Sequence, residues 1–118
     1  MKGDKISEFD QVLVHHGEEV VKLREATWNS TLLMSAAEYD KLHCAEELVK
    51  WGANVHDVDR YGDTVLHYAS YCGSDQVARW LLQQTTSNPQ LKNKYAFNSV
   101  DVAKRNNRKS TVEILLKQ

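Results

Sequence analysis

A seven-residue pattern that returns every 33 or 34 residues constrains the fold of this chain more than any other feature. Residues 31–37, with the sequence TLLMSAA, return as residues 64–70, TVLHYAS, and again as residues 98–104, NSVDVAK. A fixed period of this length is typical of stacked-repeat proteins, in which each unit is too small to bury its own apolar face. The pattern therefore predicts an extended binding surface and no deep catalytic pocket.

Each copy of the pattern predicts the start of a short helix. Thr64 precedes the apolar residues, and its hydroxyl can accept a hydrogen bond from an unpaired N–H group of the first helical turn. Leu66 and Ala69 are three residues apart and therefore share one helical face. Their counterparts in the neighbouring copies are Thr31, Leu33 and Ala36, and then Asn98, Val100, Val102 and Ala103. Small residues on this face would let successive helices stack closely.

A second helix is expected to follow each of these helices. Gly73 is suited to end the first helix, because glycine readily adopts the left-handed conformation. Ser74 and Asp75 are suited to cap a second helix from Gln76 to about Gln84. Its apolar positions and their counterparts are Val77, Trp80, Leu81 and Leu82, then Cys44, Glu47, Leu48 and Val49, then Thr111, Ile114, Leu115 and Leu116. The polar Glu47 indicates that its position lies at the edge of the buried face.

The segments between the helix pairs are predicted to be loops that project from the stack, and we call them fingers. Residues 52–63 are polar and bounded by glycines, which favours a tight hairpin. Residues 85–96 have no glycine and contain Pro89, the only proline of the chain, so we expect a longer, looser and more mobile finger. Few residues separate Leu23 from Thr31, which predicts a truncated first finger.

The middle unit resembles the ankyrin repeat. Residues 62–69, GDTVLHYA, are similar to the family signature G-x-T-P-L-H-x-A, with Val65 at the usual position of proline. Residues 51–56, WGANVH, are similar to its G-A-D-V-N segment. The resemblance runs from about Trp28 to the C-terminus. It implies an all-α ankyrin-repeat solenoid of about four stacked helix-turn-helix repeats with short β-hairpin fingers.

The resemblance divides residues 1–118, taken as a single domain, into four units. These are a degenerate N-terminal capping repeat (1–27), two repeats (28–60 and 61–93) and a C-terminal capping repeat (94–118). The first unit would pair a helix from Ser7 to His15 with one from His16 to Leu23, giving about eight helices. In the last unit Asn106-Asn107 replaces the turn glycine, because Asn also tolerates the left-handed conformation.

The resemblance also implies where a partner would bind, because ankyrin repeats usually bind proteins with finger tips and the exposed side of their first helices. The corresponding finger residues are Trp28, Ser30, Arg60, Tyr61, Asp63, Tyr95 and Phe97. The corresponding helix residues are Glu38, Tyr39, Tyr71, Cys72, Arg105 and Asn106. Tyr, Trp and Arg, which supply most interface hot spots, are frequent in this set.

Two interpretations stay open for the aromatic residues that recur at repeat spacing, which are Trp28, Tyr61, Tyr71 and Tyr95. They could anchor an extended peptide or the ridge of a folded partner, or they could pack against neighbouring fingers as part of the structure. Trp51 and Trp80 belong to second helices, and we expect them to pack against the core.

No pattern indicates catalysis, a metal or a cofactor. His15-His16, His43-Cys44 and His67 with Cys72 lack zinc-ligand spacing, because no C-x-x-C pair is present. His67 and Cys72 are five residues apart, off one helical face, which disfavours a catalytic dyad. No P-loop or G-x-G-x-x-G sequence occurs. We therefore expect no enzyme activity and no cofactor, and we expect Cys72 to be an exposed thiol that alkylating reagents reach first.

Composition favours a reducing compartment, the cytoplasm or the nucleus. No apolar run approaches the roughly 20 residues that span a bilayer, no secretory signal follows Met1, and the two cysteines form no disulfide framework. Residues 1–63 carry 13 acidic and 7 basic residues, whereas residues 88–118 carry 2 acidic and 7 basic residues. This asymmetry can orient a protein partner. Arg105, Arg108 and Lys109 could contact phosphate, but a pI of about 6.5 and the lack of a nucleic-acid fold signature disfavour nucleic acid as a partner.

These observations predict a non-catalytic protein–protein interaction module that acts as a small intracellular adaptor or inhibitor. It would be monomeric by itself and would bind a protein partner through its finger tips and concave helical face. The alternative is a structural or regulatory subunit of an enzyme complex, for example a kinase-inhibitor-like ankyrin protein. The resemblance concerns architecture, and fold alone does not assign a function.

Overall fold

The computed structural model describes residues 8–117 and, within them, seven helices. The helices are α1 (Glu8–Val20), α2 (Leu32–Glu38), α3 (Leu42–Lys50), α4 (Val65–Cys72), α5 (Asp75–Gln84), α6 (Ser99–Arg105) and α7 (Lys109–Leu116). The rest of this part consists of turns and loops, with one isolated antiparallel bridge between Arg24 and Thr31. The predicted all-α fold class is confirmed. Ser7, the expected first residue of the first helix, lies outside the described residues.

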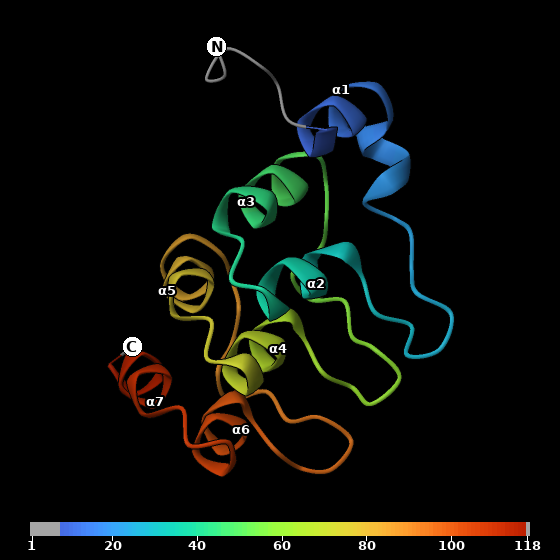
Figure 1. The fold of residues 1–118 in the computed structure, drawn as a ribbon. Helices are drawn as coiled ribbons and strands as arrows, with labels where there is room; N and C mark the ends of the chain where they lie inside the picture. The colour runs from blue at the N-terminus through green and yellow to red at the C-terminus, as the bar shows by residue number, and fades with distance from the viewer. Residues whose placement is uncertain (1–7, 118) are drawn as a thin grey trace.

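The helices form two layers that run the length of the molecule (Figure 1). The inner layer contains α2, α4 and α6, and the outer layer contains α3, α5 and α7, with contacts between successive helices in each layer. The three fingers leave the inner layer on the same side, the right of Figure 1. The molecule measures 42 × 31 × 22 Å along its principal axes, so the stack is elongated.

The three inner helices begin with the same hydrogen-bonded cap. The side chains of Thr31, Thr64 and Asn98 accept hydrogen bonds from the backbone N–H three residues later, which confirms the predicted N-caps. The third helical residue accepts a hydrogen bond from the N–H of the cap residue in return, through Met34 Sδ, His67 Nδ1 and Asp101 Oδ2. Three different side chains thus complete the same capping box.

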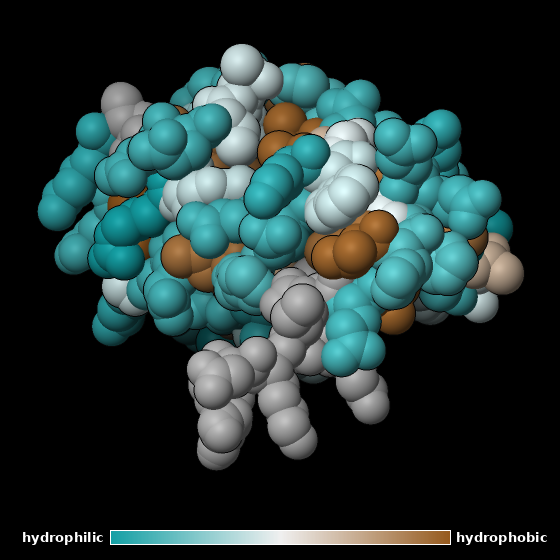
Figure 2. Space-filling model, turned by 90° about the horizontal axis from the view of Figure 1, so that it is seen from above, coloured by the Kyte–Doolittle hydropathy of each residue, from teal (hydrophilic) through white to brown (hydrophobic). Residues whose placement is uncertain are grey.

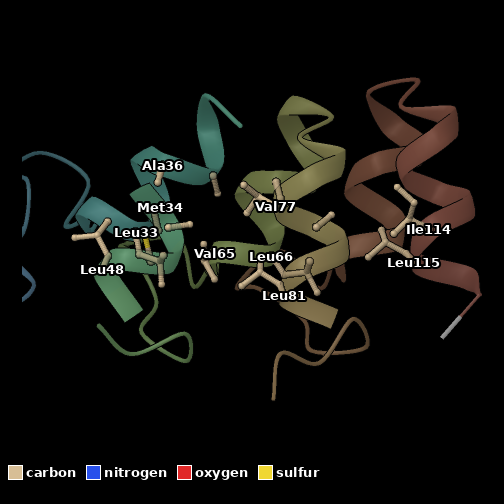
Figure 3. Close-up of a cluster of buried hydrophobic side chains, with 14 of the residues drawn as sticks. Leu33, Met34, Ala36, Leu48, Val65, Leu66, Val77, Leu81, Ile114 and Leu115 are labelled. Atoms are coloured by element: carbon tan, nitrogen blue, oxygen red, sulfur yellow. The ribbon is translucent and has the colours of Figure 1, made fainter. Parts of the chain in front are cut away.

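The buried core lies between the two layers (Figure 3). Leu66 and Ala69 are 1% and 0% exposed, which confirms the predicted face. Their counterparts Leu33, Ala36, Val100 and Ala103 are also buried, whereas Val102 is half-buried. The outer helices contribute Leu48, Val77, Leu81, Ile114 and Leu115. Trp51 and Trp80 pack partly buried against this core, as expected. Leu116 is 60% exposed, since no further repeat covers it within the described residues.

The break between the two expected N-terminal helices lies inside α1. His16 has φ −138° and ψ 19°, so helical geometry is interrupted there, at the expected boundary after His15. α1 packs on α3, and Gly17 lies against the indole of Trp51, which follows α3. A Cβ atom at Gly17 would lie 2.6 Å from Cδ2 of Trp51, so this contact requires glycine.

The turns between inner and outer helices repeat as well. Asp40, Gly73 and Asn107 occupy corresponding positions and all have positive φ, at 53°, 72° and 58°. Gly73 and Asn107 confirm their predicted roles. The expected cap by Ser74 is not observed, because its side chain makes no capping hydrogen bond.

Carboxylates near these turns join each repeat to the next. Asp75, also expected to cap its helix, instead accepts hydrogen bonds from Ser110 Oγ (2.7 Å) and Thr111 Oγ1 (2.6 Å) of α7. Asp40 Oδ1 accepts a hydrogen bond from the Val77 N–H of α5 at 3.1 Å. The cap position predicted for Asp75 is therefore used for a contact between repeats.

The lengths of the fingers differ from expectation in one case. The segments 51–64 and 85–98 contain equal numbers of residues, so the third finger is not longer than the second. The segment 21–31 is three residues shorter, which agrees with a truncated first finger. Apart from the Arg24–Thr31 bridge, turns shape the described fingers, and no β-ladder forms in them. The expected mobility of the third finger stays a prediction.

The surface seen from the α1 end is mostly hydrophilic, with separate hydrophobic areas between polar side chains (Figure 2). Val12, Val14 and Leu23 are exposed in this first unit. Within residues 8–117, no helix combines the length and the apolar character needed to cross a membrane.

Candidate functional site: a groove between the fingers and the inner helices

The three finger tips have similar loop conformations. In each tip a polar side chain at the base of the loop accepts backbone hydrogen bonds. Asp59 Oδ1 accepts hydrogen bonds from the N–H groups of Tyr61 (2.8 Å) and Asp63 (2.9 Å). Asn93 Oδ1 accepts the corresponding bonds from Tyr95 (2.9 Å) and Phe97 (3.1 Å). In both tips the base residue also donates its N–H to the carbonyl four residues later.

The first finger has a similar tip despite its shorter segment. The Glu25 carboxylate accepts hydrogen bonds from the N–H groups of Thr27 (2.7 Å) and Trp28 (2.6 Å), and these bonds lower its pKa. A residue with positive φ completes each tip: Asn29 (59°), Gly62 (79°) and Ala96 (69°). The fingers also bond to one another, because Arg60 N–H donates to Trp28 O and Lys94 N–H donates to Tyr61 O.

These loops bring three aromatic side chains into one row, which we call the aromatic row: Trp28, Tyr61 and Tyr95. The ring centroids of Trp28 and Tyr61 are 5.4 Å apart, and those of Tyr61 and Tyr95 are 5.9 Å apart. Trp28 and Tyr95 are 47% and 61% exposed. The three rings therefore pack against those of the neighbouring fingers, but much of their surface stays accessible.

A second row lies on the inner helices, and we call it the helical row: Glu38, Tyr71 and Arg105. Each residue lies seven positions after the N-cap residue of its own helix, so the row repeats from α2 to α4 to α6. All three side chains are exposed. The row therefore presents an acid, an aromatic ring and a base at equivalent positions of three successive repeats.

A groove of about 640 Å³ lies between the fingers and the inner helices. Its lining comes from all three fingers and from α2, α4 and α6. The lining residues are Trp28, Ser30, Glu38, Asp59, Tyr61, Asp63, His67, Tyr68, Tyr71, Cys72, Asn93, Phe97, Val102, Arg105 and Asn106.

The part of the groove beside α2 and α4 is acidic. The Tyr68 hydroxyl donates a 2.6 Å hydrogen bond to Asp59 Oδ2, and burial together with this bond raises the pKa of Tyr68 far above its ordinary value. Asp63 accepts a 2.7 Å hydrogen bond from Asn93 Nδ2. Burial, with a smaller contribution from the Asp59 charge, raises the pKa of Asp63 against the effect of that bond. Within the described residues, the Asp63 carboxylate forms no ion pair with a basic side chain.

The part of the groove beside α6 is basic. The Arg105 guanidinium carbon lies 4.5 Å from the centroid of the Phe97 ring, a cation–π contact. Within the described residues, Arg105 forms no ion pair with a carboxylate. Its charge is therefore available to a ligand.

His67 is buried at the floor of the groove, and both of its ring nitrogens have partners. Nδ1 accepts from the Thr64 N–H at 3.0 Å, so Nε2 carries the proton and donates to Phe97 O at 3.0 Å. The ring thereby connects α4 to the third finger. His67 therefore has a structural role in the groove floor.

Cys72 differs from its expected reactivity. Burial, followed by the nearby Glu38 charge, raises the pKa of the thiol, and Arg108 only partly offsets them. The thiol is half-buried in the groove and more strongly protonated than a free cysteine, so it is a slow nucleophile at neutral pH.

In residues 8–117 no group of three or more His, Cys, Asp or Glu side chains is placed to hold a metal ion.

The groove unites most of the residues that the sequence indicated. Those that line it are Trp28, Ser30, Glu38, Tyr61, Asp63, Tyr71, Cys72, Phe97, Arg105 and Asn106. Tyr39, Arg60 and Tyr95 do not line it, although Tyr95 belongs to the aromatic row. Whether any of them contacts a partner stays a prediction.

Five lining residues were not identified from the sequence as site residues: Asp59, His67, Tyr68, Asn93 and Val102. A signal for two of them was present, because Glu25, Asp59 and Asn93 follow one another at intervals of 34 residues. Each is a short or flexible oxygen-bearing side chain that can accept N–H groups two residues later, as in an Asx turn. The 34-residue interval is hard to recognise in the sequence because each copy carries a different residue type.

Comparison with known proteins supports the same architecture. A family model described as "Ankyrin repeats (3 copies)" matches residues 7–94. Human "Ankyrin repeat and SOCS box protein 6" is 34% identical over 59 residues, which is 50% of this chain and 14% of that protein. "I-Kappa-B like protein C2" of Microplitis demolitor bracovirus is 37% identical over 54 residues, 45% of this chain and 30% of that protein. The chain therefore spans less than a third of either relative.

A solved structure shares the fold over nearly the whole chain. A chain in the crystal structure of the yeast ribosomal protein Rps3 in complex with its chaperone Yar1 superposes with a TM-score of 0.83. The match covers 91% of this chain and 79% of that chain, at 22% sequence identity. At this identity the likeness concerns the fold alone.

Proposed function

Because the chain belongs to the ankyrin-repeat family, whose members are protein-interaction modules, we propose that it is a non-catalytic adaptor or inhibitor that binds one protein partner in the groove. The mechanism would be tethering or occlusion of that partner. Binding would cover the helical row and the accessible faces of the aromatic row.

The observation that carries this proposal is the composition of the groove walls. One wall contains Trp28 and Tyr61 of the aromatic row, and the other contains the helical row with Tyr71 at its centre. Tyr and Trp offer a large contact area and lose few rotatable bonds when they are buried, so they dominate the energy of many interfaces. Tyr71 is 58% exposed, which leaves most of its surface for a partner.

The shape of the groove favours an elongated ligand over a compact small molecule. Its lining extends across three successive repeats, and the inner helices pack in order, α2 on α4 and α4 on α6. A ligand that fills the groove must therefore reach from α2 to α6. A segment of a protein, or the ridge of a folded one, meets this requirement.

The partner can be sought by photo-cross-linking. A photoreactive amino acid placed at position 71 should capture one dominant protein in an extract of the native cells. The same amino acid at position 79, an exposed site on the outer helix α5, is the control and should capture little of it. Equal capture at both positions would contradict binding in the groove.

The captured partner then allows a quantitative test. Tyr71→Ala should weaken binding of the purified partner by about 2 kcal/mol, measured by titration calorimetry, because the ring lies at the centre of the groove wall. The melting temperature should hardly change, since the side chain is exposed. An unchanged affinity for a correctly folded variant would show that the groove is not the binding site.

A further inference from the structure

The two ends of the groove carry opposite charges, and these charges specify the chemistry of a partner. We propose that the groove binds an extended partner segment in one polarity, with a Lys or Arg side chain beside Glu38 and Asp63 and a carboxylate beside Arg105. This inference rests on the proposed function and specifies it further.

The acidic end has the composition of a site for a cationic side chain. The carboxylates of Glu38 and Asp63 line the groove together with the rings of Trp28, Tyr61 and Tyr71. In the described residues neither carboxylate forms an ion pair. A Lys or Arg side chain has an apolar stem that can pack against the rings and a charged end that can pair with the carboxylates.

Burial gives a further reason why a cation is favoured there. Asp63 is half-buried, and its carboxylate accepts a hydrogen bond from a neutral amide, that of Asn93. Asp59 is buried close by, and both of its oxygens are used by the finger tip and by Tyr68. A positive side chain in the groove would compensate two carboxylates whose hydration is already reduced, so the pair would be stronger than at an open surface.

The basic end lacks the carboxylates that the preceding repeats have at equivalent positions. Arg105 takes the place that Glu38 has in the first of the three repeats, and Asn93 takes the place of Asp59. Among the described residues of this last repeat, 94–117, Arg105 is the only charged one that lines the groove. Its guanidinium is held over Phe97 and can form a bidentate pair with a partner carboxylate.

The helix stacking sets the spacing of the two charges in the partner. Glu38 and Arg105 are on α2 and α6, which are separated by α4 in the inner layer. Packed helices are about 8–10 Å apart, so the two ends are about 16–20 Å apart. An extended chain advances about 3.3 Å per residue. The partner should therefore carry its basic and acidic residues about five to six positions apart.

A random library of displayed twelve-residue peptides, selected on the purified 118-residue chain, provides the test. Peptides that bind and lose affinity in the Tyr71→Ala variant are kept, because they occupy the groove. We expect these peptides to share a Lys or Arg, with an Asp or Glu about five to six positions away on one side only.

Charge reversal then tests the polarity. Glu38→Lys should weaken the best peptide by about tenfold. Glu46→Lys makes the same change of charge on the outer helix α3 and should have less than about a twofold effect. In the double variant Glu38→Lys/Arg105→Glu, peptides with the two charges exchanged should bind best.

The outcomes separate this inference from the proposed function. Groove-binding peptides without the paired charges, or equal effects of Glu38→Lys and Glu46→Lys, would overturn the polarity and leave the groove as the binding site. A selection that gives no groove-binding peptide would also overturn the inference, while cross-linking at position 71 decides the proposed function independently.

Discussion

At the scale of single residues, the side chains that shape the groove are largely distinct from those that would contact a partner. Asp59 uses its oxygens for the finger tip and for Tyr68, and His67 uses both ring nitrogens for Thr64 and Phe97. Their hydrogen bonds are satisfied within the chain. Tyr71 and Glu38 by contrast are exposed in the groove, where contact with a partner would replace water.

The raised pKa of Cys72 makes a prediction about its reactivity. The folded state retains the thiol proton to higher pH than the unfolded chain, so iodoacetamide should modify folded Cys72 more slowly at neutral pH. By the same linkage, Cys72 contributes stability that is complete below its unfolded pKa and is lost as the pH rises through its folded pKa. Mass spectrometry of the modified peptide over a pH series, with the urea-unfolded chain as reference, measures this. Faster modification of the folded chain would contradict it.

Ala96 and Gly62 make a matched pair for a prediction about strain. Ala96 has φ 69° at the tip of the third finger. This left-handed conformation is disfavoured by about 1–2 kcal/mol for a residue that carries a Cβ atom. Ala96→Gly should therefore raise the free energy of unfolding by about 0.5–1 kcal/mol, after the greater flexibility of unfolded glycine is subtracted. Gly62→Ala should lower it, because a Cβ atom there would lie 3.0 Å from the Lys94 nitrogen. Urea titration measures both, and changes of the same sign would refute this account.

At the scale of helices and fingers, each element is positioned by its neighbour in the next repeat. The Arg60 and Lys94 N–H groups bond to the preceding finger, and Asp75 receives two hydroxyl hydrogen bonds from α7. Such contacts explain why the third finger keeps the same tip as the second without a glycine. Its form depends on Asn93 and on the neighbouring finger as well as on its own turn residues.

The contact of α1 with α3 predicts that Gly17 does not tolerate a larger side chain. Gly17→Ala would place a methyl group 2.6 Å from the Trp51 ring, so the indole or one of the two helices has to shift. We expect a loss of about 1–3 kcal/mol of unfolding free energy, as for other overpacked cores. Glu18→Ala changes the adjacent, exposed position and serves as the control. If Trp51→Leu failed to reduce the effect of Gly17→Ala, the clash would not be its cause.

At the scale of the whole molecule, the repeats are too small to be stable alone, and each buries its apolar face against the next. A short stack of this kind should unfold as one cooperative unit. Trp28 reports on a finger, whereas Trp51 and Trp80 report on the partly buried shoulders of the outer layer. We therefore expect tryptophan fluorescence and far-UV circular dichroism to give coincident urea transitions. Separate midpoints would show that one end of the stack opens first.

The sequence was most informative where structure depends on a few adjacent residues. Thr64 and Asn98 were identified as caps because the cap bond spans only three residues. Gly73 and Asn107 were identified as turns for a similar reason. The prediction for Ser74 was wrong, since the cap preference of a serine does not reveal whether its hydroxyl has another environment in the folded stack.

The candidate site was only partly predictable, because it forms between elements about 30 residues apart. Repeat spacing placed Trp28, Tyr61 and Tyr71 along one surface, and the groove contains all three. Spacing could not show that Tyr95 would lie outside the lining, or that Tyr68 would reach Asp59. These outcomes depend on how neighbouring fingers pack against one another.

The amino-acid sequence by itself determined that this chain forms a stack of helix pairs, since capping and the burial of a small apolar face are local properties that return with each period. Only the tertiary structure decided which side chains share the groove and which carboxylates there lack a positive partner. Those features arise from packing between neighbouring repeats, where a shift of one residue in a finger changes which atoms meet.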